Sequence, residues 1–380
     1  MVSQTQIRDL RVDEADLVAN FFNQQWRPNH IFYRRRDLLL WQYYDNPYAR
    51  QFSSGLTFKG AFSSQGLVGV FGYMPFALNR CGRGGFGCHL SAWWVHPEHR
   101  RGPLAMGLLH ELQHRMNFDA CLAGINTPVA EKLYERLSWV VLRCIPRLVL
   151  PVDKDSFLRL GDPADNAITA EILSRSQSGP EMASESTESG MEVEELNGYQ
   201  RLRELGWDDF YWKQIAPAQM GPARETEYLI WRYARIPIFY YQAFIALRKG
   251  EVRGLLVFRL EQVRDQEERV VRIMDLVAGP GAAAPLIRAV VEVARREKAA
   301  MADFFHTSPT YLEAFHACGF VDTPDSSGEA YGYPHLFQPL DHARRRLNCS
   351  WWIRGLDLRT PQARNDFAIT KGDYEFDRPN

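Results

Sequence analysis

Apolar and polar positions follow two different periods along the chain, which predicts a mixed α/β fold. Some segments are rich in β-branched and aromatic residues, as strands are, whereas others place apolar residues three and four positions apart, as one helix face does. One of the expected helices also follows a Thr-Pro start signal. The expected strands are residues 66–74, 88–95, 120–125 and 143–150, and the expected helices are residues 103–116 and 129–137.

The same succession of features recurs in the second half of the chain, which indicates an internal duplication. The offset between matched positions decreases steadily along the chain, as small deletions in the second copy would produce. The matches, in chain order, pair Trp41 and Tyr43 with Trp231 and Tyr233, Gly69 with Gly254, Val95 with Ala278, and Thr127 with Ser308.

A Ser- and Glu-rich segment separates the two copies. Residues 174–195 contain six Ser, six Glu and no aromatic residue, too little apolar surface to offset chain entropy. We therefore predict an N-terminal domain at 1–155, a linker at 156–196 with a disordered acidic segment, and a second domain at 197–380. Each domain is expected to hold a mixed, twisted sheet flanked by helices.

Composition narrows the classes of function. The 380 residues are 46% hydrophobic and 24% charged, which is typical of globular domains, and 45 Lys+Arg against 46 Asp+Glu leave a net charge of −1. That balance excludes the general basic field of non-specific nucleic-acid binders. We expect no nucleic-acid or membrane partner, and cytoplasmic localisation, because no 18-residue apolar run and no Cys-x-x-Cys pair occur. A homo-oligomer is left open.

The most informative stretch runs from Trp93 to Ala105, WWVHPEHRRGPLA, and predicts a strand, a loop and the start of a helix. Arginines and a glycine directly before a helix N-terminus favour an anion, because unpaired N–H groups and the helix dipole converge there. A diphosphate group suits such a site.

This stretch resembles the GNAT superfamily of N-acetyltransferases. The matching positions are Val95, Pro97, Glu98, Arg100 and Ala105, followed by a second motif at Asn126, Ala130, Leu133 and Tyr134. The family's usual loop glycine falls at Pro103, with Gly102 one place earlier. The resemblance implies that acetyl-CoA or another acyl-CoA is the co-substrate, held by Trp94, Val95, His96, Arg100, Arg101, Gly102, Leu104, Ala105 and Asn126.

The resemblance also implies catalytic roles. Tyr134 matches the residue that gives a proton to the departing thiolate, and His89 falls where a general base is placed on the strand. Ser91 is a second polar candidate, since strand alternation would put His89, Ser91, Trp93 and Val95 on one face. Packing of Tyr134 on its helix, or burial of His89 in the core, is the alternative for each.

An aromatic and arginine-rich region at 21–50 suggests the acceptor site. Tyr33, Arg34, Arg35 and Arg36 are the candidate substrate-binding residues, and they favour an anionic or aromatic acceptor. An amino sugar, nucleotide-linked or free, would satisfy this chemistry. For Trp41 and Tyr43, which recur in the second copy, packing is the favoured interpretation.

The second copy lacks several of these features. Its loop reads GPGAAAPLI without an arginine, and Phe315 replaces Tyr134. Tandem GNAT proteins of the mycothiol synthase and Fem types combine one working unit with one degenerate unit, so we expect this copy to help form the acceptor cleft. The tail Trp351-Trp352-Ile353 predicts either a closing strand over the second unit or an oligomer contact.

A competing motif, His110-Glu111-Leu112-Gln113-His114, has the spacing of a zinc-binding helix. Both histidines lie opposite the apolar stripe of their helix and should face solvent, so no metal is expected. The sequence thus favours a CoA-dependent N-acyltransferase that acts by direct attack. The alternatives are a Fem-type aminoacyl or peptidyl transferase and a non-catalytic ligand-binding module.

Overall fold

The structure is a computed structural model. It describes residues 5–100, 102–161, 166–177, 190–323, 333–334, 340–341, 347–356 and 367–373. Within these ranges, no helix combines the length and the apolar character that a membrane span needs.

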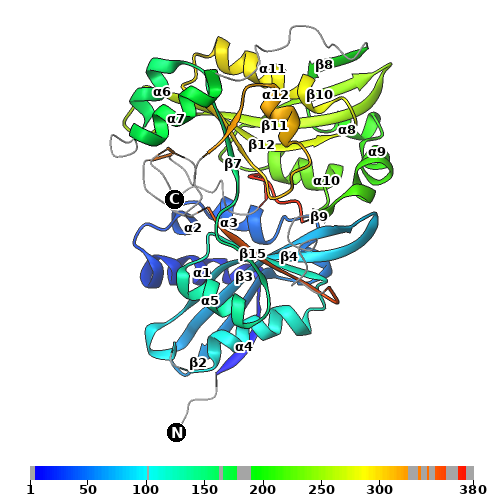
Figure 1. The fold of residues 1–380 in the computed structure, drawn as a ribbon. Coiled ribbons are helices and arrows are strands. Elements are labelled where there is room, and N and C mark those ends of the chain that lie inside the picture. The colour runs from blue at the N-terminus through cyan, green and yellow to red at the C-terminus, as the bar shows by residue number, and fades with distance from the viewer. Residues whose placement is uncertain are drawn as a thin grey trace.

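Two mixed sheets form the centre of the fold, one above the other in Figure 1. Across the first sheet the strands are β1 (Gln6–Leu10), β2 (Leu56–Ser63), β3 (Gly66–Arg80), β4 (Arg83–Val95), β5 (Ala120–Gly124), β15 (Cys349–Ile353) and β6 (Val140–Leu142), with β9 (Met220–Pro222) against β3. Across the second they are β8 (Met191–Glu195), β10 (Gln242–Arg248), β11 (Glu251–Gln262), β12 (Arg269–Ala278), β13 (Met301–Phe305), β7 (Arg147–Pro151) and β14 (Val321–Asp322).

Helices flank both sheets, so the predicted fold class is confirmed. The first half holds α1 (Ala15–Phe21), α2 (Ile31–Arg34), α3 (Arg36–Tyr43), α4 (Leu104–His110), α5 (Pro128–Arg136), α6 (Lys154–Leu160) and α7 (Asn166–Gln177). The second holds α8 (Arg201–Glu204), α9 (Trp207–Phe210), α10 (Thr226–Leu229), α11 (Ala283–Arg296) and α12 (Leu312–Ala317). Helix α5 begins as its sequence predicts, because Thr127 Oγ1 accepts a hydrogen bond from the Ala130 N–H at 3.2 Å.

Each sheet contains a strand from the opposite half of the chain. Strand β7 leaves the first half and lies between β13 and β14, whereas β15 returns from the C-terminal region and lies between β5 and β6. Figure 1 shows β7 in the upper half of the molecule and β15 in the lower half. The strand predicted at 143–150 corresponds to β7, which begins at Arg147 and belongs to the second sheet rather than the first. The tail strand β15 thus belongs to the first sheet. The prediction that it closes over the second unit is wrong.

The expected linker contains regular structure. Helix α7 and most of α6 lie within it, and β8 is an edge strand paired with β10 rather than part of a disordered segment. Alternating side chains of β8 pack against the hydrophobic core of the second sheet. The high content of Ser and Glu hid this alternation in the sequence. Residues 178–189 of the acidic segment lie outside the described residues.

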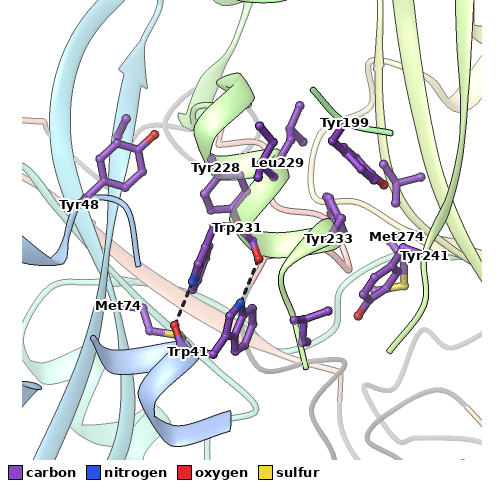
Figure 2. Close-up of a cluster of buried hydrophobic side chains, with 14 of the residues drawn as sticks. Trp41, Tyr48, Met74, Tyr199, Tyr228, Leu229, Trp231, Tyr233, Tyr241 and Met274 are labelled. Atoms are coloured by element: carbon purple, nitrogen blue, oxygen red, sulfur yellow. Dashed lines mark hydrogen bonds between the residues drawn. The ribbon is translucent and has the colours of Figure 1, made fainter. Parts of the chain in front are cut away.

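The two halves meet at a symmetric pair of tryptophans (Figure 2). The rings of Trp41 and Trp231 stack at 4.8 Å, and each indole N–H donates to the carbonyl oxygen of the other residue, at 3.0 and 2.9 Å. Both side chains are buried. The packing interpretation of this repeated motif is confirmed, and the reciprocal geometry is consistent with two related units.

Candidate functional site

Strands β4 and β5 separate in the middle of the first sheet. They pair in parallel from Gly87 and Ala120 as far as Leu90 and Ala123. Beyond that pair, a cavity of about 260 Å³ lies between them. Its lining comes from β4 (Leu90, Ser91, Ala92, Trp93), from β5 and the following loop (Ala123, Gly124, Ile125, Asn126, Thr127), from α5 (Ala130, Tyr134), and from Trp26 and Phe71.

A β-bulge in β4 shapes this cavity. Pairing with β3 passes from Gly72–Ser91 to Val70–Trp94, so that Ala92 and Trp93 together oppose Phe71. Ala92 has φ +50°, in the left-handed region that residues other than glycine seldom adopt. A bulge bends its strand and withdraws one residue from the ladder of backbone hydrogen bonds. Backbone groups of residues 91–93 therefore border the cavity.

The bulge also corrects the predicted alternation along β4. Ser91 contacts the Tyr43 hydroxyl on the face covered by α3, whereas Trp93 stacks on Phe71 at 4.6 Å on the opposite face. The extra residue reverses the direction of every side chain after it. His89 and Ser91 thus share one face, and Trp93 and Val95 share the other.

Two of the predicted catalytic residues border the cavity. Tyr134 lies on the α4 and α5 side, is 3% exposed and stacks on Trp139 at 4.5 Å. Burial raises the pKa of its phenol, so the hydroxyl keeps its proton at neutral pH. Ser91 borders the cavity from the other face of the sheet, with its Oγ 2.7 Å from the Tyr43 hydroxyl. The cavity is therefore lined by residues from both faces of the sheet.

His89 is not among the cavity's lining residues. Its ring packs on Phe76 with centroids 4.7 Å apart, and its side chain is buried. Burial, and then the charges of Arg224 and Arg232, lower the pKa of this imidazole to about 3. A general base works best with a pKa near the operating pH, so the geometry does not support the predicted role.

Acid should destabilise the protein through two buried histidines, His89 and His306. Burial lowers the pKa of His306 to about 4. Between pH 7 and pH 5 the unfolded chain gains protons that these folded imidazoles do not bind, so unfolding becomes easier as the pH falls. We expect each to remove about 2 kcal/mol over this interval. Urea unfolding measured at both pH values should show a smaller pH dependence in His89→Asn and His306→Asn. An identical dependence in wild type and both variants would refute this assignment.

The predicted cofactor-binding loop follows β4 directly. Trp94 stacks on Trp26 at 5.7 Å, and the Arg100 guanidinium lies 4.4 Å from the Trp94 ring centre. Arg100 Nε also donates to the Val95 carbonyl oxygen at 2.8 Å. Arg100 thus contacts Trp94, Trp94 contacts Trp26, and Trp26 lines the cavity. The His96 N–H donates to Val68 O at 2.8 Å, which fixes the start of the loop.

The loop ends at helix α4, whose first turn carries the other predicted positions. Leu104 is buried in the core and Ala105 is half-buried, so only their backbone N–H groups can meet a ligand. Gly102 is exposed, and a Cβ there would meet only the His99 carbonyl oxygen, at 3.8 Å. Arg101 lies outside the described residues. The first N–H groups of a helix have no intrahelical acceptor, which leaves an anion-binding end here.

Asn126 belongs to the cavity wall, but its side chain is already engaged. Its Nδ2 donates to Ser350 Oγ at 3.0 Å and to Ala123 O at 3.3 Å. Its backbone pairs with the side chain of Asn348. Asn348 and Ser350 could not be predicted as part of this site. Nothing in their local spacing places them beside Asn126, which lies more than 200 positions earlier in the chain.

The predicted substrate-binding residues lie away from the cavity lining. Tyr33 and Arg34 are exposed. Arg35 is paired with Asp37 at 2.6 Å, and Arg36 is paired with Asp16. These carboxylates offset two of the three positive charges that suggested an anionic acceptor.

The corresponding wedge in the second unit is closed. Between β12 and the chain after β13 lies a C-terminal segment, residues 367–373. The Gly372 N–H donates to Met274 O at 2.7 Å, and the Thr307 N–H donates to Ile369 O at 3.1 Å. The Tyr311 hydroxyl further bonds to the N–H and C=O of Ala278, at 2.9 and 3.3 Å. In the second unit, the backbone groups equivalent to those that border the cavity of the first unit are thus hydrogen-bonded to other parts of the chain.

Outside the closed wedge, the second unit keeps a cavity of about 390 Å³ beside the loop at residues 279–281. The lining that the structure describes there includes Glu313 but no arginine or lysine. Such a lining does not favour a diphosphate.

The histidines of the zinc-like motif face solvent, as expected. His110 and His114 are exposed, with ring centroids 4.9 Å apart. Glu111 between them forms ion pairs with Arg115 at 3.2 Å and Lys59 at 3.9 Å. No group of three His, Cys, Asp or Glu residues suited to a metal occurs in the described part of the chain.

Comparison with known proteins shows the fold. No protein-family model matches the sequence, and no curated protein matches it. Among solved structures, a conserved protein of unknown function from Enterococcus faecalis V583, described as a probable N-acyltransferase, is similar over 94% of this chain and 74% of its own, with TM-score 0.57 and 9% identity.

Two further structures are GCN5-related N-acetyltransferases. That of Kribbella flavida gives TM-score 0.53 at 14% identity, with 96% of this chain and 74% of the other covered. That of Anabaena variabilis ATCC 29413 gives TM-score 0.50 at 13% identity, with 92% and 73% covered. The likeness extends over both sheets, and the chain has the fold of these N-acetyltransferases.

Proposed function

We propose that the protein is an acyl-CoA-dependent N-acyltransferase whose reaction takes place in the cavity between β4 and β5. The observation that carries this proposal is a cavity lined from both faces of the sheet, bordered by a bulged backbone and by Tyr134. Thioester aminolysis needs these parts, because an oxyanion must be stabilised and a thiolate must leave.

The residues present fit an acyl-CoA. The lining is mainly apolar, which suits an extended pantetheine arm, and the Arg100 loop with the start of α4 would hold the diphosphate. When bound, this co-substrate supplies an activated acyl thioester. Pro103 precedes the helix and has no N–H, so the phosphate donors would be the backbone of Leu104, Ala105 and Met106 together with Arg100.

The chain's own groups divide the chemical tasks. Backbone N–H groups at the bulge, near Ala92 and Trp93, would stabilise the oxyanion. Tyr134 would donate its proton to the departing thiolate on one side of the sheet, and Ser91, hydrogen-bonded to Tyr43, would orient the amine on the other side. The amine would attack as the free base, and the proton that its nitrogen loses would return to Tyr134 through solvent, so that an amide and a thiol remain. Burial, followed by interaction with Cys121, raises the pKa of Cys88 beneath the cavity. That thiol stays protonated and is a poor nucleophile, which favours direct attack by the amine.

Coenzyme A binding tests the proposal. With ligand at about a hundred times Kd, binding to the folded state adds about 2.7 kcal/mol, so Tm should rise by a few degrees. Millimolar coenzyme A that leaves Tm unchanged would contradict the proposal and favour the Fem-type alternative, which uses aminoacyl-tRNA. Binding without thiol release from acyl-CoA over a panel of amines would favour a ligand-binding module instead.

The acceptor is proposed to be a small primary amine, with amino sugars as the first class to test. Tyr33 and Arg34 do not line the cavity, but they are exposed on α2, the helix that follows the lining residue Trp26, and so support a polar acceptor that approaches past Trp26. Free and nucleotide-linked amino sugars should be compared with polyamines and amino acids. Faster thiol release with polyamines than with every amino sugar would overturn this assignment and leave the acyltransferase itself intact.

A further inference from the structure

The loop between β5 and α5 forms one wall of the cavity and adopts an uncommon backbone conformation. Ile125 has φ +52°, where a β-branched side chain is disfavoured. Such a conformation persists only when its surroundings hold it in place. Strand β15 and the residues before it, from the other end of the chain, make those contacts.

Asn348 makes most of these contacts and is 1% exposed. Its Oδ1 accepts the Asn126 N–H at 2.6 Å, and its Nδ2 donates to Asn126 O at 3.0 Å. Its own carbonyl oxygen accepts the Ile125 N–H at 3.0 Å. One residue thus satisfies three backbone groups of two consecutive loop residues, a strong restraint on the direction of the loop.

The same side chain also reaches helix α5. Asn348 Nδ2 donates to Glu131 Oε1 at 2.6 Å, and Glu131 is itself 4% exposed. Helix α5 carries Tyr134, one turn beyond Glu131. Asn348 therefore connects the cavity wall to the helix that carries the proposed proton donor.

We propose that Asn348 is a positioning residue for the acyl-donor site, so that the C-terminal region of the chain completes the cavity of the first unit. This inference rests on the proposed function. Asn348 touches no reacting atom. It acts through Asn126 and Glu131, and its effect is on how well the cavity fits an acyl-CoA.

Asn348→Asp is the direct test. The aspartate keeps the size and one acceptor of the asparagine but loses the donor to Asn126 O and Glu131, and it places two carboxylates side by side. Removing a buried hydrogen bond to a charged group typically corresponds to a factor of ten or more. We expect the affinity for coenzyme A to fall at least about tenfold. KM for acyl-CoA should rise similarly, whereas KM for the amine should not change.

Two variants separate positioning from general destabilisation. Ile353→Val alters the far end of β15, where Ile353 packs in the core opposite Ala120, and should lower stability without changing coenzyme A affinity. Asn348→Asp combined with Glu131→Gln restores a donor between the two side chains and should recover most of the lost affinity. If Asn348→Asp does not fold, Ser350→Ala removes only the acceptor of Asn126 Nδ2, and it should still weaken binding.

Hydrogen exchange gives a readout that needs no ligand. The amides of Ile125 and Asn126 should exchange faster in Asn348→Asp than in wild type or Ile353→Val. Equal coenzyme A affinity in wild type and Asn348→Asp, or in wild type and Ser350→Ala where only that variant folds, would overturn this inference alone. Failure of the wild type to bind coenzyme A would overturn the proposed function, and the role of Asn348 with it.

Discussion

Replacing Tyr134 by phenylalanine should lower kcat about a hundredfold or more while leaving the affinity for coenzyme A within about twofold, since a general acid contributes at least this factor. The ring, its stacking on Trp139 and its burial all remain in the variant. Only the hydroxyl is lost, and with it the proton for the departing thiolate. Steady-state rates together with calorimetric titration of coenzyme A measure the two effects separately.

Tyr73→Phe is the matched control. Tyr73 is buried in the same hydrophobic cluster as Tyr134 but does not border the cavity, so the loss of its hydroxyl should leave kcat unchanged. An equal loss of rate and coenzyme affinity in Tyr134→Phe would instead show that this tyrosine only packs.

Replacing Ala130 by tyrosine should abolish coenzyme A binding, with a loss of at least about a hundredfold in affinity, because a ring would occupy the cavity. The second unit has a tyrosine at the equivalent position. Tyr311 stands at the position that matches Ala130 in the internal repeat, and its hydroxyl takes both backbone groups of Ala278. Ala130 is half-buried and borders the cavity, so the folded state should tolerate the change.

Two control variants accompany this measurement. Ala130→Ser should bind coenzyme A as the wild type does, and Tyr311→Phe, which removes the hydrogen bonds to Ala278, should not affect binding in the first unit. Undiminished binding by Ala130→Tyr would place the coenzyme somewhere other than between β4 and β5.

The local order of elements could be predicted from the sequence, whereas the detail that shapes the cavity could not. Within the predicted helix at 103–116, α4 and the π-helical turn that continues it cover residues 104–115, and residues 120–124 form a strand, because apolar spacing reports which face of an element is buried. The bulge at Ala92 has no such signal, since neither glycine nor a turn residue stands there. For that reason Trp93 was assigned to the wrong face of β4.

Strand pairing was the second feature of the fold that could not be predicted from the sequence. The residues of β7 and β15 have the composition of strands, but the identity of their neighbours depends on contacts more than 100 residues away in the chain. Of the residues singled out by local motifs, Tyr134, Ser91 and Asn126 border the cavity, and their roles stay predictions. Asn348 was missed because its partner lies in another element.

The exchange of β7 and β15 has an evolutionary consequence. A recombination event that replaced the second half of this gene would also replace the strand beside Asn126, together with Asn348 and Ser350. The half without an open wedge therefore supplies side chains and a strand on which the open half depends, so neither half could be exchanged alone without loss of these contacts.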